Sequence, residues 1–166
     1  MFLNLFGNNK KGFSIVEILA AIVVISIALV GLSGLASFSL RASSLAEQTA
    51  QANSIAQETI ESLRNFRDGT YWNINGLGTL AMDVNYYPQE TGSPLKWQLV
   101  QGTGTTGMFT RKIVLSNVQR DANDNIVGSG GTNDPQTKKV VATVSWQERG
   151  KSHKVEITTY LTAWKQ

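Results

Sequence analysis

Side chains that commonly carry out catalysis are scarce in this chain of 166 residues. It contains no cysteine and one histidine, His153. Without cysteine the chain cannot form a disulfide framework, a thiolate zinc site or a cysteine nucleophile. A single histidine excludes a histidine-rich metal site and argues against a hydrolytic Ser-His-Asp triad. We therefore expect neither enzyme activity nor a bound cofactor.

One glycine motif matches a nucleotide-binding pattern by its letters. Gly102, Gly104 and Gly107 are spaced as G-x-G-x-x-G. The dinucleotide fingerprint requires a strand before this motif and a helix after it, so that the helix N-terminus faces the phosphates. Residues 109–118 have the apolar alternation of a strand instead. We therefore predict a flexible loop at this position and no nucleotide site.

A group of carboxylate and amide side chains resembles the beginning of a calcium loop. Asp121, Asn123 and Asn125 stand at alternate positions, and oxygen ligands at this spacing can hold calcium. The glycine expected at the sixth loop position is Ile126, and the bidentate glutamate expected at the twelfth is Thr132. A solvated turn is therefore the main prediction, with calcium binding as the alternative. A melting temperature unchanged by calcium or chelator would exclude that alternative.

The most informative pattern is a long apolar segment near the beginning of the chain. Charged residues make up 16% of the sequence, yet the 23 residues from Ile18 to Leu40 include no ionisable side chain. About 20 such residues allow a helix to cross the hydrocarbon of a bilayer. Lys10 and Lys11 precede the segment and favour a cytoplasmic N-terminus. The sequence therefore predicts a single-pass protein of the cytoplasmic membrane, or a secreted one.

Two ordinary interpretations of the segment leave some of its features unexplained. A secretory signal has an apolar region of about 7–15 residues, and the run before the small-x-small site at residues 34–36 is longer. A plain membrane anchor leaves Glu17 unexplained, because a buried carboxylate costs several kcal/mol unless it is paired, protonated or close to water. Both interpretations remain open alternatives.

A third interpretation accounts for the whole pattern. Lys10, Lys11, Gly12, Phe13 and Glu17, followed by about twenty apolar residues, resemble the type IV prepilin signal. That family contains type IV pilins, type II secretion pseudopilins and competence pseudopilins. The resemblance implies that a prepilin peptidase cleaves between Gly12 and Phe13 and then N-methylates Phe13.

The resemblance also implies partners and a site of assembly. Glu17 would pair with the new α-amino group of a neighbouring subunit. The partners would be the prepilin peptidase, the cytoplasmic membrane and other pilin or pseudopilin subunits. The subunit would leave the membrane for an extracellular or periplasmic filament that serves adhesion, motility, secretion or DNA uptake.

Helical periodicity continues beyond the apolar segment. Residues 43–66 contain no glycine or proline, and Asp68-Gly69 supplies a stop signal. We therefore predict one helix over residues 14–67. Apolar residues recur at steps of three, four and seven, which is the spacing of one helical face: Leu45, Ala52, Ile55, Ala56, Ile60, Leu63 and Phe66.

The rest of the chain has the alternation typical of strands. We predict turns over residues 70–106 with one short strand at 96–101, and further strands over 109–118, 138–147 and 154–164. Residues 148–152 read as a hairpin turn. The expected fold class is α+β, in which a long N-terminal helix packs against a C-terminal antiparallel sheet of three or four strands.

The expected domain organisation has three parts. Residues 1–12 form a leader peptide, residues 13–67 form the long helix and residues 68–166 form an exported β-rich domain. The transmembrane part of the helix covers about residues 18–40.

The C-terminal strands extend the resemblance. They are similar to those of minor pilins of the pilus-modification type and of minor type II secretion pseudopilins. Many major pilins close their last loop with a disulfide, which this chain cannot form, so a minor subunit is favoured. Trp146 and Trp164 are expected in the core or at the sheet edge.

Two alternatives concern the exported region, whose net charge from Arg41 onward is +2. A competence pseudopilin would bind DNA through basic side chains on or near the strands. A membrane-anchored binding domain would never assemble into a filament. The basic side chains in question are Arg111, Lys112, Arg120, Lys138, Lys139, Arg149, Lys151 and Lys154.

Overall fold

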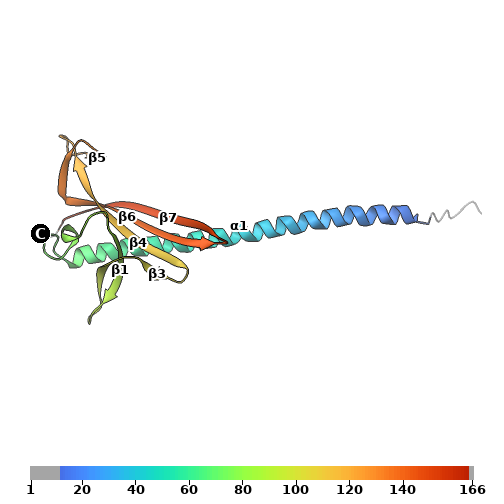
Figure 1. Cartoon of the computed structure of the whole chain (residues 1–166), viewed down its shortest axis with the longest axis horizontal. Coiled ribbons are helices and arrows are strands. Elements are labelled where there is room, and N and C mark those ends of the chain that lie inside the picture. The colour runs from blue at the N-terminus through green and yellow to red at the C-terminus, as the bar shows by residue number, and fades with distance from the viewer. Residues whose placement is uncertain (1–11, 165–166) are drawn as a thin grey trace, which may run out of the picture. The chain divides into compact units, whose positions relative to one another are not determined.

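The computed structural model describes residues 12–164 (Figure 1). Contacts divide the chain into two compact units, one that ends at Ala46 and one that begins at Glu47. Helix α1, Ile15–Gly69, has 55 residues and contributes to both units. The predicted long helix is therefore confirmed, and it begins one residue later and ends two residues later than the predicted range of 14–67.

The part of α1 in the first unit has no packed side chains. Every residue from Gly12 to Ser43 is exposed, including the entire charge-free segment. Its polar side chains are satisfied locally, because the hydroxyls of Ser26, Ser33 and Ser37 each donate to the carbonyl four residues earlier. A helix with its backbone groups and serine hydroxyls satisfied internally is suited to an apolar environment.

The second unit combines the rest of α1 with one antiparallel sheet and a short 3₁₀ helix, η1, at Leu77–Thr79. Among the described residues the sheet has the strand order β2-β1-β4-β6-β7, and β3 and β5 each pair with β4. Its strands are β1 Asn85–Thr91, β2 Lys96–Gln101, β3 Gly104–Thr106, β4 Phe109–Arg120, β5 Ile126–Val127, β6 Thr132–Glu148 and β7 Lys151–Thr162.

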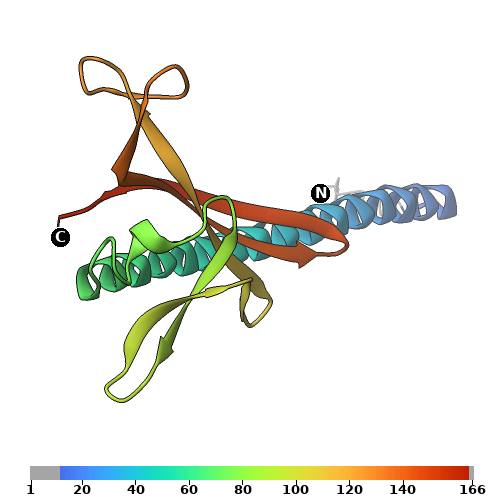
Figure 2. The same cartoon turned by 60° about the vertical axis from the view of Figure 1, so that its left-hand side comes forward.

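The hydrophobic core lies between the sheet and the helical segment of the second unit, which crosses one face of the sheet (Figure 2). On the helix it uses the predicted apolar face, from Ala52 to Phe66. On the sheet it uses alternate positions of β4 and β6. The buried core cluster consists of Ile60, Leu63, Phe66, Trp72, Leu77, Tyr86, Ile113, Leu115, Val140, Ala142 and Leu161.

Three polar contacts fix the direction of the sheet relative to this helical segment. The indole N–H of Trp146 donates to Gln48 Oε1 at 2.8 Å, and that of Trp164 donates to Asp68 Oδ1 at 3.0 Å. Between them, Arg111 pairs with Glu58 at 2.9 Å. The β6–β7 turn is therefore at the Glu47 end of the segment, and the C-terminal end of β7 is near Asp68.

The α+β class is confirmed, but the predicted number of three or four strands is wrong. Strand β1 lies in the region expected to form turns. Proline is tolerated there because Pro88 pairs with β2, whereas the pairing of β1 with β4 covers only Asn85 and Tyr86. At Pro88 no strand pairs with the other edge of β1, so the missing N–H of proline costs no ladder hydrogen bond there.

The glycine motif forms a hairpin and not the predicted flexible loop. Gly104 begins β3, which pairs with β4 through a turn at Gly107 that has φ of +58°. A Cβ atom on Gly104 would lie 2.7 Å from the ring of Tyr87, so a close approach to an aromatic side chain explains this glycine. A strand follows the motif, as predicted, and no helix N-terminus faces it.

Candidate processing and assembly site

The predicted cleavage site lies just before the first turn of α1. Gly12, Phe13 and Ser14 precede the helix, and the Phe13 side chain is 79% exposed. A Cβ atom on Gly12 would meet no atom within 4 Å. The fold therefore does not require glycine at this position, and the Gly12–Phe13 bond has the exposure that proteolysis needs.

Glu17 is in the first turn of the helix. The Ser14 carbonyl accepts hydrogen bonds from the backbone N–H groups of Glu17, at 3.0 Å, and Ile18, at 3.2 Å. A carboxylate in this turn interacts favourably with the positive end of the helix dipole. Within residues 12–164 the Glu17 side chain has no hydrogen-bond or ion-pair partner.

The segment that follows Glu17 presents apolar side chains in every direction around the helix. Ile18, Leu19, Ile22 and Val23 are each at least half exposed, and so are the large apolar residues as far as Leu40. The helix is long enough and apolar enough to cross a membrane. Lys10 and Lys11, on which the predicted orientation depends, lie outside the described residues.

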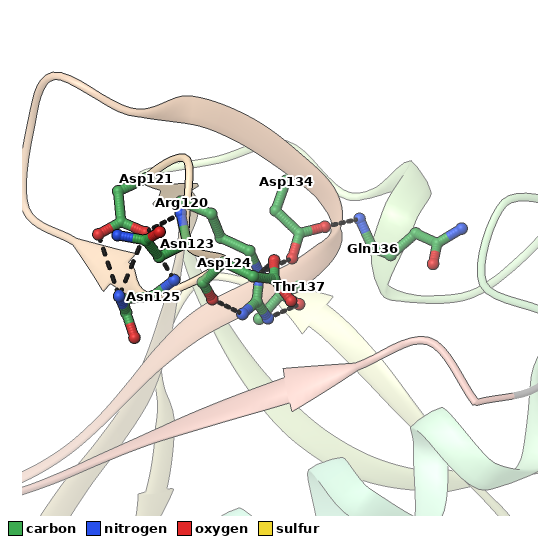
Figure 3. Close-up of polar contacts among 8 residues, drawn as sticks. All are labelled: Arg120, Asp121, Asn123, Asp124, Asn125, Asp134, Gln136 and Thr137. Carbon is green, nitrogen blue, oxygen red and sulfur yellow. Dashed lines mark hydrogen bonds and ion pairs between the residues drawn. The ribbon is translucent and has the colours of Figure 1, made fainter.

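The second unit brings the calcium candidates Asp121, Asn123 and Asn125 into one loop (Figure 3). The Asp121 carboxylate accepts from the backbone N–H groups of Asn123 and Asn125 and from the Asn125 side-chain amide. These donors lower the pKa of Asp121, chiefly through the Asn125 side chain. Within residues 12–164 no group of three or more Asp, Glu or His side chains is arranged to hold a metal. The solvated turn stays the main prediction, with calcium binding as the alternative.

A neighbouring charge cluster in Figure 3 was not predicted from the sequence. Arg120 Nε lies 2.8 Å from Asp134 Oδ2, and the same guanidinium donates to the Asp124 carbonyl and to Thr137 Oγ1. The Thr137 hydroxyl, followed by Arg120, lowers the pKa of Asp134. The cluster joins the two ends of the loop between β4 and β6. Opposite charges on either side of a turn-rich segment were the only sequence signal.

The basic residues considered for DNA binding do not form one surface. Arg111, Arg120 and Lys138 are at least half buried and bond to Glu58, Asp134 and Asn117 respectively. Burial lowers the pKa of Lys138.

The remaining basic residues fall into two further groups. Lys112, Lys139 and Lys154 share the face of the sheet opposite the core, where Lys154 pairs with Glu156 at 3.1 Å. That ammonium lowers the pKa of Glu156. Arg149 is in the exposed β6–β7 turn, and Lys151 is the exposed first residue of β7. DNA binding stays an alternative, which a salt-sensitive shift of labelled DNA would test.

Comparison with known proteins finds a match at the beginning of the chain, around the predicted cleavage site and the apolar segment. Residues 7–33 match the family model described as the prokaryotic N-terminal methylation motif. The matched residues include Gly12, Phe13 and Glu17. No curated protein and no solved structure matches the chain. The motif indicates a type IV pilin-like structural subunit, and it implies processing by a prepilin peptidase and assembly with other pilins.

Proposed function

We propose that this chain is a prepilin of the minor type, polymerised through its apolar helix into a pilus or pseudopilus. Prepilin peptidase cuts between Gly12 and Phe13 and methylates the new N-terminus. The observation that carries the proposal is the coincidence of the methylation motif with an exposed Gly12–Phe13 bond and an unpacked apolar helix. The role is mechanical, and the chain catalyses no reaction.

The proposal assigns a task to each part of the chain. Residues 1–12 are the leader, which stays in the cytoplasm with Lys10 and Lys11. Residues 13–67 form the helix, which holds the subunit in the cytoplasmic membrane through about residues 18–40 before assembly. Residues 68–166 are the exported domain. The helix from Glu47 onward also belongs to the compact second unit, where it covers the core of the sheet.

Glu17 has a specific role in this proposal. Cleavage gives Phe13 a positive α-amino group, four residues before the Glu17 carboxylate. When helices pack with a stagger, the Glu17 of one subunit lies beside the amine of the next. A charge in an apolar environment is tolerated when it is paired, and loss of one partner strands the other. Glu17 therefore favours the assembled state over the isolated subunit in the membrane.

The first test is the N-terminus of the mature protein taken from its native membrane, by intact mass and peptide sequencing. N-methylated Phe13 is the expected result. An intact Met1 would contradict processing and support a plain membrane anchor. A chain that begins at Ser37 would show that the apolar segment is a secretory signal.

A further inference from the structure

The β6–β7 hairpin carries two exposed basic side chains at its turn. Arg149 and Lys151 flank Gly150 and are exposed, and neither forms a salt bridge within residues 12–164. Glu148 is the cross-strand partner of Lys151, so the two side chains share one face of the hairpin, although no salt bridge joins them within residues 12–164. The Glu148 side chain is 19% exposed and lies 4.0 Å from His153 Nε2. Counted together with Glu148, the two cations give the turn a net charge of +1.

An exposed apolar side chain lies at the same end of the sheet as these cations. The β3–β4 turn exposes about half of Met108. Phe109 follows it directly, and its ring packs edge-on against Trp146 with centroids 5.7 Å apart. The β3–β4 turn and the β6–β7 turn are therefore at the same end of the sheet. We call Met108, Arg149, Gly150 and Lys151 the tip surface.

The chain tethers the tip surface close to the apolar segment. The Trp146–Gln48 hydrogen bond places it at the Glu47 end of the helical segment in its own unit. Gln48 is eight residues after Leu40, where the charge-free segment ends. Eight residues span at most about 28 Å even when fully extended. Whatever the arrangement of the two units, the tip surface cannot move far from the surface of the membrane that holds the apolar segment.

We propose that the tip surface docks on anionic phospholipid headgroups before the subunit enters a filament. The charges are complementary, and an exposed apolar side chain at the same end of the sheet suits the boundary between headgroups and acyl chains. Each cation near an anionic membrane surface strengthens binding by about fivefold. Docking would hold the exported domain against the bilayer and release it when the subunit is extracted. The inference rests on the proposed membrane anchorage and not on filament formation.

The test uses the full chain in vesicles of phosphatidylcholine with or without phosphatidylglycerol. Because the chain has no cysteine, Ser152→Cys provides a single site for a fluorophore beside the tip surface. Energy transfer to an acceptor on lipid headgroups then reports docking. We expect transfer to rise with phosphatidylglycerol and to fall at high salt. Arg149→Gln/Lys151→Gln should reduce the docked-to-undocked ratio by roughly 25-fold, since each cation contributes about fivefold.

The matched control is Lys96→Gln/Lys139→Gln, which removes the same charge from β2 and from the distant part of β6. This control should dock like the parent. Transfer that ignores phosphatidylglycerol, or that survives loss of Arg149 and Lys151, would overturn the proposal. Energy transfer that depends on the number of protein chains per vesicle, and not on phosphatidylglycerol, would also overturn the proposal. That result would assign the tip surface to contact with a second copy of the chain.

Flotation of the same vesicles separates this inference from the proposed function. A chain that floats with both kinds of vesicle but shows no transfer is anchored and undocked, which rejects the docking alone. A chain that floats with neither kind of vesicle lacks the anchor, which rejects both proposals.

Discussion

Glu17 is the residue whose position is hardest to explain by the isolated subunit. It is the only ionisable residue between Gly12 and Leu40, and within residues 12–164 its carboxylate has no partner. The serines of the same helix avoid this cost because they donate to backbone carbonyls. A carboxylate can only accept hydrogen bonds, and the helix N–H groups beyond the first turn are already used. In the proposed filament, the partner of Glu17 is the α-amino group of a neighbouring subunit.

Replacement of Glu17 should separate membrane insertion from assembly. We expect Glu17→Ala or Glu17→Val to insert normally, because both changes make the segment more apolar, and to appear in sheared filaments at a much lower level. The measurement is the ratio of subunit in the filament fraction to subunit in the membrane fraction. Glu47→Gln is the control, since it removes an exposed charge from the same helix. Wild-type incorporation of the Glu17 variants would refute the assembly role.

The Arg120–Asp134 pair makes stability depend on pH in a defined direction. The pKa of Asp134 is lower in the folded chain than its ordinary value of 3.8. Its contribution is therefore complete above about pH 4 and is lost as the pH falls through the folded-state pKa. Asp134→Asn should lower the free energy of unfolding at pH 7 by about 1–3 kcal/mol.

Denaturant unfolding at pH 7 and near pH 3 checks this prediction. The difference between wild type and Asp134→Asn should shrink at the lower pH. Asp124→Asn is the control, because its side chain is 86% exposed and lies 3.6 Å from Arg120 Nε. Exposed pairs of this kind contribute about 0–1 kcal/mol. A constant difference across this pH range would contradict the assigned cause.

At the scale of elements, the contact between α1 and the sheet accounts for the core. Leu63 is completely buried in the cluster that includes Ile113 and Val140. Leu63→Ala should therefore cost about 2–5 kcal/mol of unfolding free energy, from lost apolar burial and the cavity left behind. Ile74→Ala, at a position 77% exposed, is the control and should change stability by less than about 0.5 kcal/mol. Equal effects of the two changes would show that the helix does not pack as described.

Two polar residues are buried where this helix packs against the sheet. Thr59 and Ser62 lie on the packed face, where the apolar spacing alone does not place them. Their hydroxyls donate to the carbonyls of Ile55 and Glu58, at 2.7 and 2.8 Å. Small side chains that satisfy their own polar atoms allow the helix and sheet to approach closely.

At the scale of the whole molecule, the two units of the chain suit two different environments. Residues 12–46 offer an apolar surface and include no buried residue, whereas every buried core residue of the described chain lies after Glu47. We therefore expect a fragment of residues 47–166 to be soluble and to unfold cooperatively. Gel filtration and thermal melting measure this.

A shorter fragment is the control for that expectation. Residues 70–166 keep every strand but lose Ile60, Leu63 and Phe66, which cover the sheet. This fragment should aggregate or lack a cooperative transition, because one face of its sheet would be exposed. Cooperative melting of residues 70–166 with unchanged midpoint would contradict the role of the helix in the core.

Local patterns in the sequence determined much of this protein. The processing motif needs only the order of Gly12, Phe13, Glu17 and the apolar run. The length of α1 and the buried face of β6, from Val140 to Trp146, follow from periodicities of a few residues. Such features depend on neighbours along the chain, so they can be predicted without knowledge of the fold.

Tertiary structure decided the features that depend on distant partners. Arg111 interrupts the apolar face of β4, and only its contact with Glu58, 53 residues earlier, explains it. The turn-rich region around Pro88 became a strand because β2 and the beginning of β4 pair with it. Trp146 reaches Gln48 across 98 residues and so directs the tip surface toward the Glu47 end. Pairing energy between segments far apart in sequence has no local signature, and only the folded chain reveals it.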